Sequence, residues 1–164
     1  MKIRTVADRD MAAIHAIYRD AVLHGVSSWE EVPPSIAELT RRRDAILSGG
    51  FPYLVAEQND AVLGYAYASP YRPRSAYRYT VENTIYLAKE ARGKGLGRLL
   101  LEALITACQA KGYKQMIAVI GDSENEVSIG FHARMGFERV GLIRNIGFKF
   151  DRWMDQVIMQ KGLG

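Results

Sequence analysis

The sequence predicts an α/β protein in which helices pack against a single mixed sheet. The first observation is the order of its apolar segments, whose periodicities read βααβββαβαββ along the chain. The second is the length: 164 residues, of which 48% are hydrophobic, make one domain that buries roughly 70% of the surface of its unfolded chain. The third is that no repeat, low-complexity tract or linker divides the sequence. We therefore expect residues 1–164 to form a single domain.

The amino-terminal segment is expected to form a strand and a first helix. KIRTVADRD is typical of a strand that leads to Asp8 as the N-cap of the helix. The apolar residues that follow recur at the spacing of one helix face, namely Met11, Ile14, Ile17, Tyr18 and Val22. The prolines of VPPS then end this part of the chain.

A second helix and a hairpin follow. Ser35 and Glu38 have the spacing of a capping box, and the helix that they begin ends at the glycines 49–50. Residues 53–58 (YLVAEQ) and 61–68 (AVLGYAYA), joined by an Asn-Asp turn, predict a β-hairpin.

The second half of the chain is expected to alternate strands with two helices. One helix runs from about Arg98 to Lys111. Ser123 and Glu126 have the spacing of a second capping box, which begins a helix that ends near Gly136. The predicted strands are the segments TVENTIYL, KQMIAVI, FERVGLI and WMDQVIMQ.

Composition narrows the cellular setting and the chemistry. MKIRTVADRD has no apolar core, so we expect no secretory signal, and no run of ~20 apolar residues is available to span a membrane. These two features favour the cytoplasm. The single cysteine, Cys108, excludes an intramolecular disulfide and is expected in the core, and no His or Cys spacing indicates a metal site. The net charge of +4 favours anionic ligands only weakly.

The most informative stretch is ARGKGLGRLLLEALI, in which three glycines precede an apolar segment of helical period. A tight turn between a strand and a helix binds anions, because the first helical N–H groups lack partners and the helix dipole adds positive charge. Gly93, Gly95 and Gly97 would let the backbone approach a phosphate closely. The cationic side chains of the stretch are Arg92, Lys94 and Arg98. The spacing matches neither the dinucleotide-binding fingerprint nor the P-loop.

The pattern Arg92-x-x-Gly95-x-Gly97 resembles the pyrophosphate loop of the GNAT N-acetyltransferases, which lies between a strand and a helix. ENEVSIGFHARMGF is similar to a later segment of the same family. Four segments resemble the phosphinothricin and methionine-sulfoximine acetyltransferase branch: IYRDAVL, SSWEEVPPS, YRPRSAYRYTVENTIYL and NIGFKFDRW. The resemblance implies the GNAT fold, with one mixed, mostly antiparallel sheet flanked by helices. It also implies acetyl-CoA as co-substrate, no metal, and a homodimer.

The same resemblance implies where acetyl-CoA binds. The backbone of Ile85, Tyr86 and Leu87 would hydrogen-bond the pantetheine arm, and one of its N–H groups would polarise the thioester. The residues expected to hold the pyrophosphate are Arg92, Gly93, Lys94, Gly95, Leu96, Gly97 and Arg98. Asn125 resembles the family's pantetheine-contacting asparagine, and Ser128 lies one helical turn further on the same face.

Acetyl transfer to an amine requires that the amine lose a proton and benefits from a proton for the departing thiolate. Glu82 is the candidate base, acting through water, because strand alternation places it with Thr84 and Tyr86 on one face near the expected thioester. The alternative is that Glu82 is an ordinary solvated carboxylate. Glu30, in SSWEEV, is the second candidate carboxylate. His132 stands where many family members carry a tyrosine, so it is expected either to protonate the thiolate or to contact the cofactor.

The loop from Tyr71 to Tyr79 is rich in arginine and tyrosine and directly precedes the Glu82 strand. Because an arginine grips both oxygens of a carboxylate, we expect the acceptor to be a small amino-acid-like compound that reacts at its α-amino group. The resemblance implies methionine sulfoximine, methionine sulfone or phosphinothricin. The residues expected to bind the acceptor are Arg72, Arg74, Ser75, Ala76 and Tyr77.

Three other functions stay open at this point. A GNAT enzyme that acetylates a peptide, a polyamine or another amine would need a more open and usually acidic groove, whereas this loop is cationic. A nonenzymatic acyl-CoA-binding module would keep the fold without catalysis. A nucleic-acid binder would use the arginines and tyrosines of the loop, but the small net charge argues against it. We expect neither nucleic acid nor a membrane as a partner.

Overall fold

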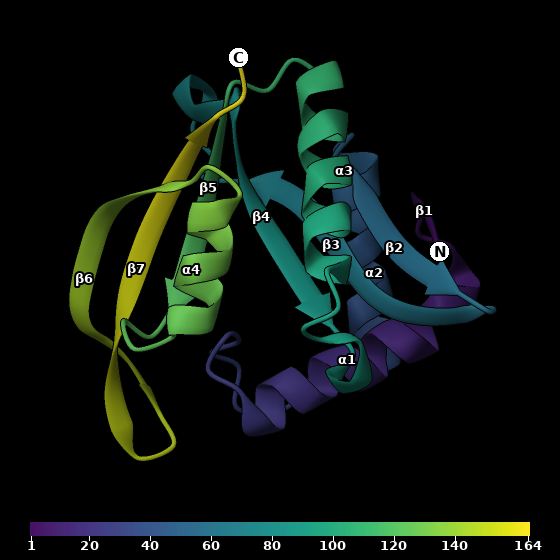
Figure 1. Ribbon diagram of the computed structural model, residues 1–164, viewed down its shortest axis with the longest axis horizontal. Helices are drawn as coiled ribbons and strands as arrows, with labels where there is room; N and C mark the ends of the chain where they lie inside the picture. The colour runs from purple at the N-terminus through teal and green to yellow at the C-terminus, as the bar shows by residue number, and fades with distance from the viewer.

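The computed structural model of the protein describes all 164 residues. Its strands form one seven-stranded sheet in the order β1-β2-β3-β4-β5-β7-β6 (Figure 1). Every neighbouring pair is antiparallel except β4 with β5, which confirms the predicted mixed, mostly antiparallel sheet. The strands are β1 (Lys2–Thr5), β2 (Tyr53–Gln58), β3 (Ala61–Pro70), β4 (Thr80–Leu87), β5 (Gln115–Gly121), β6 (Glu138–Lys149) and β7 (Arg152–Gly162).

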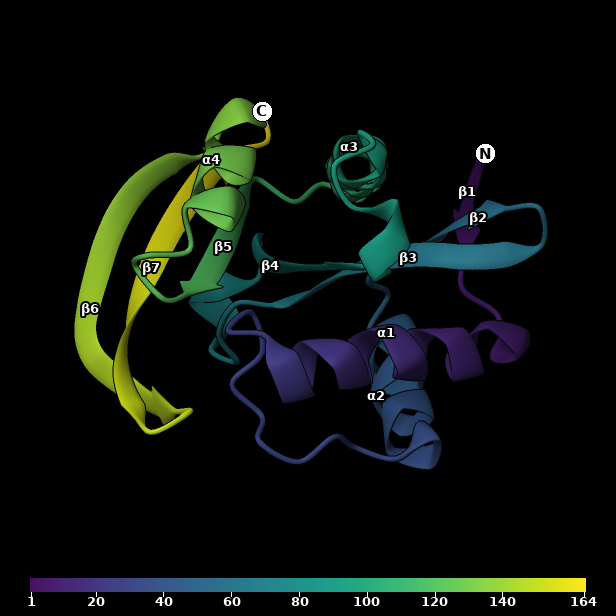
Figure 2. The same ribbon diagram turned by 60° about the horizontal axis from the view of Figure 1, so that its bottom comes forward.

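Four α-helices cover the two faces of the sheet. α1 (Met11–His24) and α2 (Ile36–Ser48) lie on one face, whereas α3 (Leu96–Ala110) and α4 (Glu126–Arg134) lie on the other (Figure 2). Short 3-10 turns also occur at η1 (Asp8–Asp10), η2 (Ser75–Tyr77) and η3 (Lys89–Ala91). The order of strands and α-helices agrees with the order predicted from the sequence. No helix has the length and apolar character needed to cross a lipid bilayer.

The core lies on both faces of the sheet, with α3 on one side and α1 and α2 on the other. Leu100, Leu101, Leu104 and Cys108 recur at helical spacing and are fully buried on one side of α3. They belong to one cluster that includes buried residues of the central strands, such as Val81. The predicted core position of Cys108 is confirmed, and burial raises the pKa of its thiol to about 12.

The sequence predicted the N-cap of α2 correctly but not that of α1. Ser35 caps α2 as predicted, because its hydroxyl accepts the N–H of Glu38 at 3.1 Å. The prediction for α1 is wrong: Asp8 begins the turn η1 and does not cap the helix. The carboxylate of Asp10 instead accepts the N–H of Ala7 at 2.7 Å, which closes that turn.

The predicted capping box of α4 is also wrong. Asn125, and not Ser123, caps the helix, and its side-chain oxygen accepts the N–H of Ser128 at 3.3 Å. The Ser123 hydroxyl donates to Asp155 on β7 at 2.9 Å. A long-range hydrogen bond has therefore replaced the local one that Ser123 and Glu126 predicted.

The sheet opens where its only parallel pair ends. β4 and β5 are paired from Thr80 with Gln115 to Glu82 with Ile117. Beyond Glu82, β4 stays paired with β3 and β5 with β7, so the two strands diverge (Figure 1). We call the opening between residues 83–87 of β4 and the end of β5 the wedge. It leaves the β5-facing edge of β4 without a strand partner.

Candidate active site

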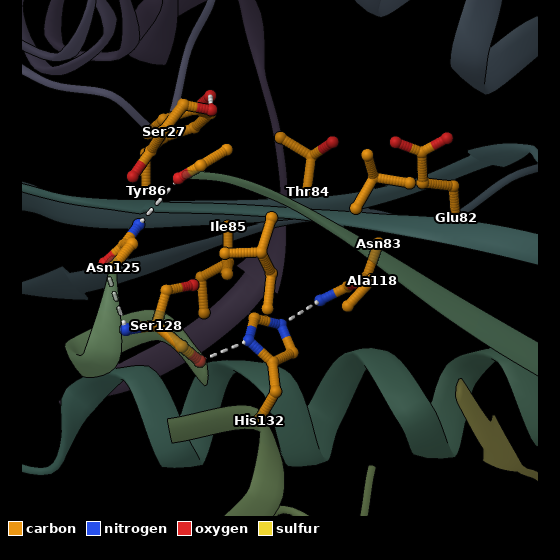
Figure 3. A pocket seen from close by; sticks show the side chains of 13 residues that line it. Ser27, Glu82, Asn83, Thr84, Ile85, Tyr86, Ala118, Asn125, Ser128 and His132 are labelled. Atoms are coloured by element: carbon orange, nitrogen blue, oxygen red, sulfur yellow. Dashed lines mark hydrogen bonds between the residues drawn. The ribbon is translucent and has the colours of Figure 1, made fainter. Parts of the chain in front are cut away.

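A cavity of about 150 Å³ lies in the wedge. Its walls come from β4, β5, α4 and the coil that follows α1 (Figure 3). The lining residues are Ser27, Glu82, Asn83, Thr84, Ile85, Tyr86, Ala118, Val119, Ile120, Gly121, Asn125, Ser128 and His132. The structure thus brings together six residues expected at the site from the sequence, namely Glu82, Ile85, Tyr86, Asn125, Ser128 and His132.

A larger groove of about 1320 Å³ continues from the wedge to the glycine-rich loop. The residues that line both spaces are Ser27, Ile85, Tyr86, Asn125 and Ser128, so the two are continuous. At its other end, the groove is lined by Leu87, Arg92, Gly93, Gly95, Gly97 and Arg98. The expected binding residues for pantetheine and pyrophosphate therefore lie along one path.

The glycines of the loop differ in their geometry. Gly93 and Gly95 have φ angles of +73° and +79°, in the left-handed region that other residues rarely adopt. Gly97 lies within α3, and a Cβ added there would make only an ordinary contact, 3.4 Å from Leu87. α3 begins at Leu96, two residues before the predicted Arg98, and no side chain caps it. The first N–H groups of α3 are therefore free to bind an anion.

Arg92 and Arg98 form surface ion pairs, and Arg92 also donates to the carbonyl oxygen of Leu87 at 3.4 Å. Arg92 lies 3.3 Å from Asp20, and Arg98 lies 2.8 Å from a glutamate one turn further along α3. Exposed pairs of this kind contribute about 0–1 kcal/mol, so a phosphate competes with them readily. Two residues of the expected loop do not line the groove. Lys94 is exposed beside it, and Leu96 is 2% exposed with its side chain in the core.

Glu82 projects from β4 on the same side as Thr84 and Tyr86, whereas Asn83 projects on the other side, as strand alternation predicts (Figure 3). The Glu82 carboxylate makes no hydrogen bond with the protein. Partial burial raises the pKa of Glu82, and the positive charge of Arg72 opposes this shift. A carboxylate with a raised pKa and free oxygens is suited to accept a proton.

Two hydrogen bonds fix the ring of His132. Nδ1 lies 2.9 Å from the carbonyl oxygen of Ser128, which only accepts, so Nδ1 carries the proton. Nε2 then accepts from the side-chain Nδ2 of Asn83 at 3.0 Å. Burial lowers the pKa of His132, which favours this neutral form. In this form Nε2 has no proton to donate, and a role as general acid requires a second proton against that shift.

Glu30 lies outside both spaces and is held in an ion pair. Its two oxygens accept from the guanidinium of Arg42 at 3.0 and 2.8 Å, and the hydroxyl of Tyr18 donates to the same carboxylate. These contacts lower the pKa of Glu30, and the hydrogen bonds from Arg42 have the largest effect. A paired carboxylate with a lowered pKa is a poor proton acceptor, so the geometry favours Glu82 as the base.

The residues expected to bind the acceptor lie on an exposed loop and do not line the wedge or the groove. They are Arg72, Arg74, Ser75, Ala76 and Tyr77. The guanidinium of Arg72 lies 5.4 Å from the centre of the Tyr71 ring. Of the five residues, only Arg72 affects Glu82, through its charge.

Two residues of the site were missed by the sequence reasoning. Ser27 lines both spaces, and its carbonyl oxygen accepts the Tyr86 hydroxyl at 3.2 Å. Asn83 is 7% exposed and holds His132, while its Oδ1 has no hydrogen-bond partner. A polar residue between Val81 and Ile85 on the apolar face of the strand was the signal that could have identified Asn83.

Comparisons with known proteins agree with this geometry. Residues 3–158 match the protein-family model described as an acetyltransferase (GNAT) domain. The chain is 50% identical to the phosphinothricin N-acetyltransferase of Alcaligenes faecalis, over 98% of this chain and 82% of that protein. It is 43% identical to the L-methionine sulfoximine/L-methionine sulfone acetyltransferase of Pseudomonas paraeruginosa, over 98% of this chain and 94% of that protein.

A solved structure is similar over almost the whole chain. It is a GNAT superfamily phosphinothricin acetyltransferase from Sinorhizobium meliloti in complex with AcCoA. The TM-score is 0.96 at 48% sequence identity, and the match covers 99% of this chain and 88% of that one. Sequence, fold and site geometry lead to the same conclusion: the chain belongs to the GNAT family of N-acetyltransferases.

Proposed function

We propose that this N-acetyltransferase transfers the acetyl group of acetyl-CoA to the α-amino group of a small amino-acid-like acceptor. Methionine sulfoximine, methionine sulfone and phosphinothricin are the acceptors that fit best, because relatives at 43% and 50% identity are named for them. The observation that carries the proposal is the continuous space from the glycine-rich loop to Glu82. It joins an anion site at a helix N-terminus to an unpaired carboxylate with a raised pKa.

Acetyl-CoA occupies this space from one end to the other. Its pyrophosphate binds at the N-terminus of α3, where backbone N–H groups are free and Arg92 and Arg98 supply positive charge. Its pantetheine arm follows the open edge of β4, where the backbone of residues 85–87 pairs with its amides as an added strand would. The thioester then lies in the wedge, where one of these N–H groups polarises its carbonyl.

Glu82 receives the proton that the acceptor ammonium must lose, directly or through a water molecule. The neutral amine attacks the thioester carbon, the carbon–sulfur bond breaks, and the nitrogen releases its second proton as CoA leaves as a thiolate that takes up a proton. The product is the N-acetyl amino acid. We assign His132 to the wall of the cofactor site and not to thiolate protonation, because its Nε2 accepts a hydrogen bond from Asn83.

Arg72 and Arg74 are proposed to bind the carboxylate of the acceptor. Both side chains are exposed, and the loop from Tyr71 to Tyr79 contains no acidic residue. The positive charge of Arg72 opposes the rise in the pKa of Glu82, which supports an acceptor carboxylate bound on this side of the proposed base. The cationic side chains of this loop favour an acceptor with a free carboxylate and disfavour a polyamine or a basic peptide.

A thiol-release screen tests this proposal. Acetyl-CoA is offered with each amino acid, the three compounds named above, their carboxamides, a polyamine and a short peptide. We expect the fastest thiol release with the methionine-like compounds and a large loss with their carboxamides. Faster release with the polyamine or the peptide would overturn the acceptor assignment. No release with any amine would leave a nonenzymatic acyl-CoA-binding module.

We also propose that the protein is a homodimer and acts in the cytoplasm, as the sequence analysis expects. The dimer is supported by large apolar side chains that β6, β7 and their connecting turn expose. They are Val140, Leu142, Ile143, Ile146, Phe148, Phe150 and Trp153. An exposed apolar patch of this kind marks a protein contact. Sedimentation of the purified protein tests the assembly, and a monomer at micromolar concentration would refute it.

A further inference from the structure

Two segments that stand out in the sequence, SSWEEVPPS and NIGFKFDRW, lie against each other in the structure. The first forms most of residues 25–35, which we call the α1–α2 coil, and the second spans the turn from β6 to β7. Figures 1 and 2 both show the coil between α1 and the β6–β7 hairpin. Their hydrogen-bonded residues are 121 and 124 positions apart in the chain.

Lys149, at the end of β6, joins the two segments. It is 2% exposed, and its Nζ donates to the carbonyl oxygens of Gly25 at 2.9 Å and Ser28 at 2.6 Å. Burial lowers the pKa of Lys149, and the nearby carboxylates act on it only through longer-range charge. Burying an ammonium without a paired carboxylate is costly. In return, the ammonium of Lys149 fixes the positions of the two carbonyl groups.

Trp29 attaches the coil at a second point. A Cβ added to Gly147 of β6 would lie 2.5 Å from Cζ3 of Trp29, and one added to Gly121 of β5 would lie 2.5 Å from its Nε1. Neither glycine has a positive φ angle, so steric contact and not backbone conformation requires glycine at both positions. The indole ring excludes a Cβ at Gly147, and the indole together with the carbonyl oxygen of Val26 excludes one at Gly121. The coil is thus fixed to β5 by the indole and to β6 by both the indole and the ammonium of Lys149.

The opposite side of the coil belongs to the candidate site. Ser27 lines both the wedge and the groove, and its carbonyl oxygen accepts the Tyr86 hydroxyl. The Ser28 hydroxyl lies 2.9 Å from the hydroxyl of Tyr18, whose ring packs edge-on against that of Tyr86. Tyr86 and Glu82 project on the same side of β4 (Figure 3). A displacement of the coil would therefore change the space beside the proposed base.

We infer that Lys149 is a positioning residue for the acceptor: by holding the carbonyls of Gly25 and Ser28, it sets the distance between the α1–α2 coil and β4. That distance determines the space in which the side chain of the acceptor lies beside Glu82. The inference rests on the proposed function for the identity of the acceptor. The N–H groups proposed to bind the pyrophosphate belong to the start of α3, whereas Lys149 holds carbonyls of the α1–α2 coil.

Three lysine variants test the inference. Lys149→Met keeps the length of the side chain and removes the donors, whereas Lys149→Arg keeps donors. Lys114→Met is the matched control, because the Lys114 Nζ donates to a backbone carbonyl, that of Gly164, at 2.9 Å and is not part of the site. The measurements are kcat and KM for the acceptor, the affinity for acetyl-CoA, and hydrogen exchange of residues 25–31.

We expect Lys149→Met to raise the acceptor KM by about tenfold or more, because two hydrogen bonds from a charged donor are lost. Its affinity for acetyl-CoA should change little, exchange of residues 25–31 should become faster, and Lys149→Arg should restore most of the KM. Lys114→Met should behave as the wild type. If Lys149→Met does not fold, Gly147→Ala, which displaces Trp29, must show the same split between acceptor KM and acetyl-CoA affinity.

An unchanged acceptor KM in Lys149→Met, or equal losses of acceptor and acetyl-CoA binding, would overturn the inference. The proposed function fails in a different way, namely if the wild-type protein acetylates none of the amino-acid-like compounds. In that case the exchange measurement still decides whether Lys149 holds the coil. Unchanged exchange of residues 25–31 in Lys149→Met would then reject the proposal that Lys149 holds the coil.

Discussion

Replacing Glu82 by glutamine removes the proposed proton acceptor of the wedge and keeps the shape of the side chain. A positioned general base contributes about 10²–10⁴-fold to the rate of such a step. Glu82 is the only carboxylate that lines the wedge, and the pKa of Glu30 is lowered by Arg42, so no other side chain is placed to substitute. We therefore expect the turnover of Glu82→Gln at neutral pH to fall within that range.

The pH dependence identifies the cause of the loss. In the wild type, kcat/KM falls as the pH drops through the raised pKa of Glu82, because the protonated carboxyl accepts no proton. In Glu82→Gln this limb should be absent, and the rate should recover partly at alkaline pH, where free amine is abundant. Initial rates of thiol release between about pH 5 and 9.5 measure both profiles, a range that brackets the ordinary titrations of a histidine and of an α-amino group.

Thermal unfolding tests whether the variant is intact. Because burial raises the pKa of Glu82, the folded state binds this proton more tightly than the unfolded state. The charged carboxylate therefore disfavours the folded state increasingly as the pH rises from the ordinary pKa of 4.5 to the raised value. Glu82→Gln removes that cost, so its melting temperature at pH 7 should equal or exceed that of the wild type.

Glu30→Gln is the matched control. It breaks the ion pair with Arg42 outside both spaces, so its pH–rate profile should keep the limb of the wild type. The assignment of the base is wrong if Glu82→Gln retains the wild-type profile, or if Glu30→Gln loses it.

Five further variants, in three experiments, test the rest of the site. Gly95→Val should abolish the thermal stabilisation by acetyl-CoA, because a β-branched residue strains the left-handed backbone. Gly97→Ala should retain most of this stabilisation, and a thermal-shift titration with acetyl-CoA compares the two variants. His132→Ala leaves the buried Asn83 amide unpaired, so it should lower the free energy of unfolding by about 1–3 kcal/mol, measured in urea. If this variant loses more turnover than acetyl-CoA affinity, His132 is the general acid and our assignment is wrong. Arg72→Ala and Arg74→Ala should each raise the acceptor KM by about tenfold without weakening acetyl-CoA binding. With an acceptor whose carboxylate is blocked as a carboxamide, both variants should have the same KM as the wild type.

The sequence predicted those parts of the site that depend on neighbours along the chain. The glycine-rich loop was recognisable because its turn, its free N–H groups and the start of α3 all lie within a few residues. The direction of Glu82 followed from strand alternation alone. The order of helices and strands was predictable for the same reason, because each periodic segment specifies its own secondary structure.

The remaining features depend on partners that are distant in sequence. Ser123 had a good local pattern for a helix cap, but Asp155 on β7 takes its hydroxyl. His132 could be read as an acid until Asn83, 49 residues earlier, was found to occupy its Nε2. Glu30 was the second candidate carboxylate, and its pairing with Arg42 on α2 is visible only in the structure. Only the packed fold determines which of these polar groups remain free.

Because Cys108 is completely buried, its labelling by a thiol reagent can report how often the core of this protein opens. Thiol reagents react with thiolates, and burial that raises the pKa of the only thiol to about 12 keeps it silent in the folded protein. The CoA released during turnover is then measured without background from the protein. In the absence of turnover, Cys108 reacts only when α3 leaves the sheet, so the labelling rate measures how often the core opens. The slowing of that rate by acetyl-CoA measures its binding without any acceptor.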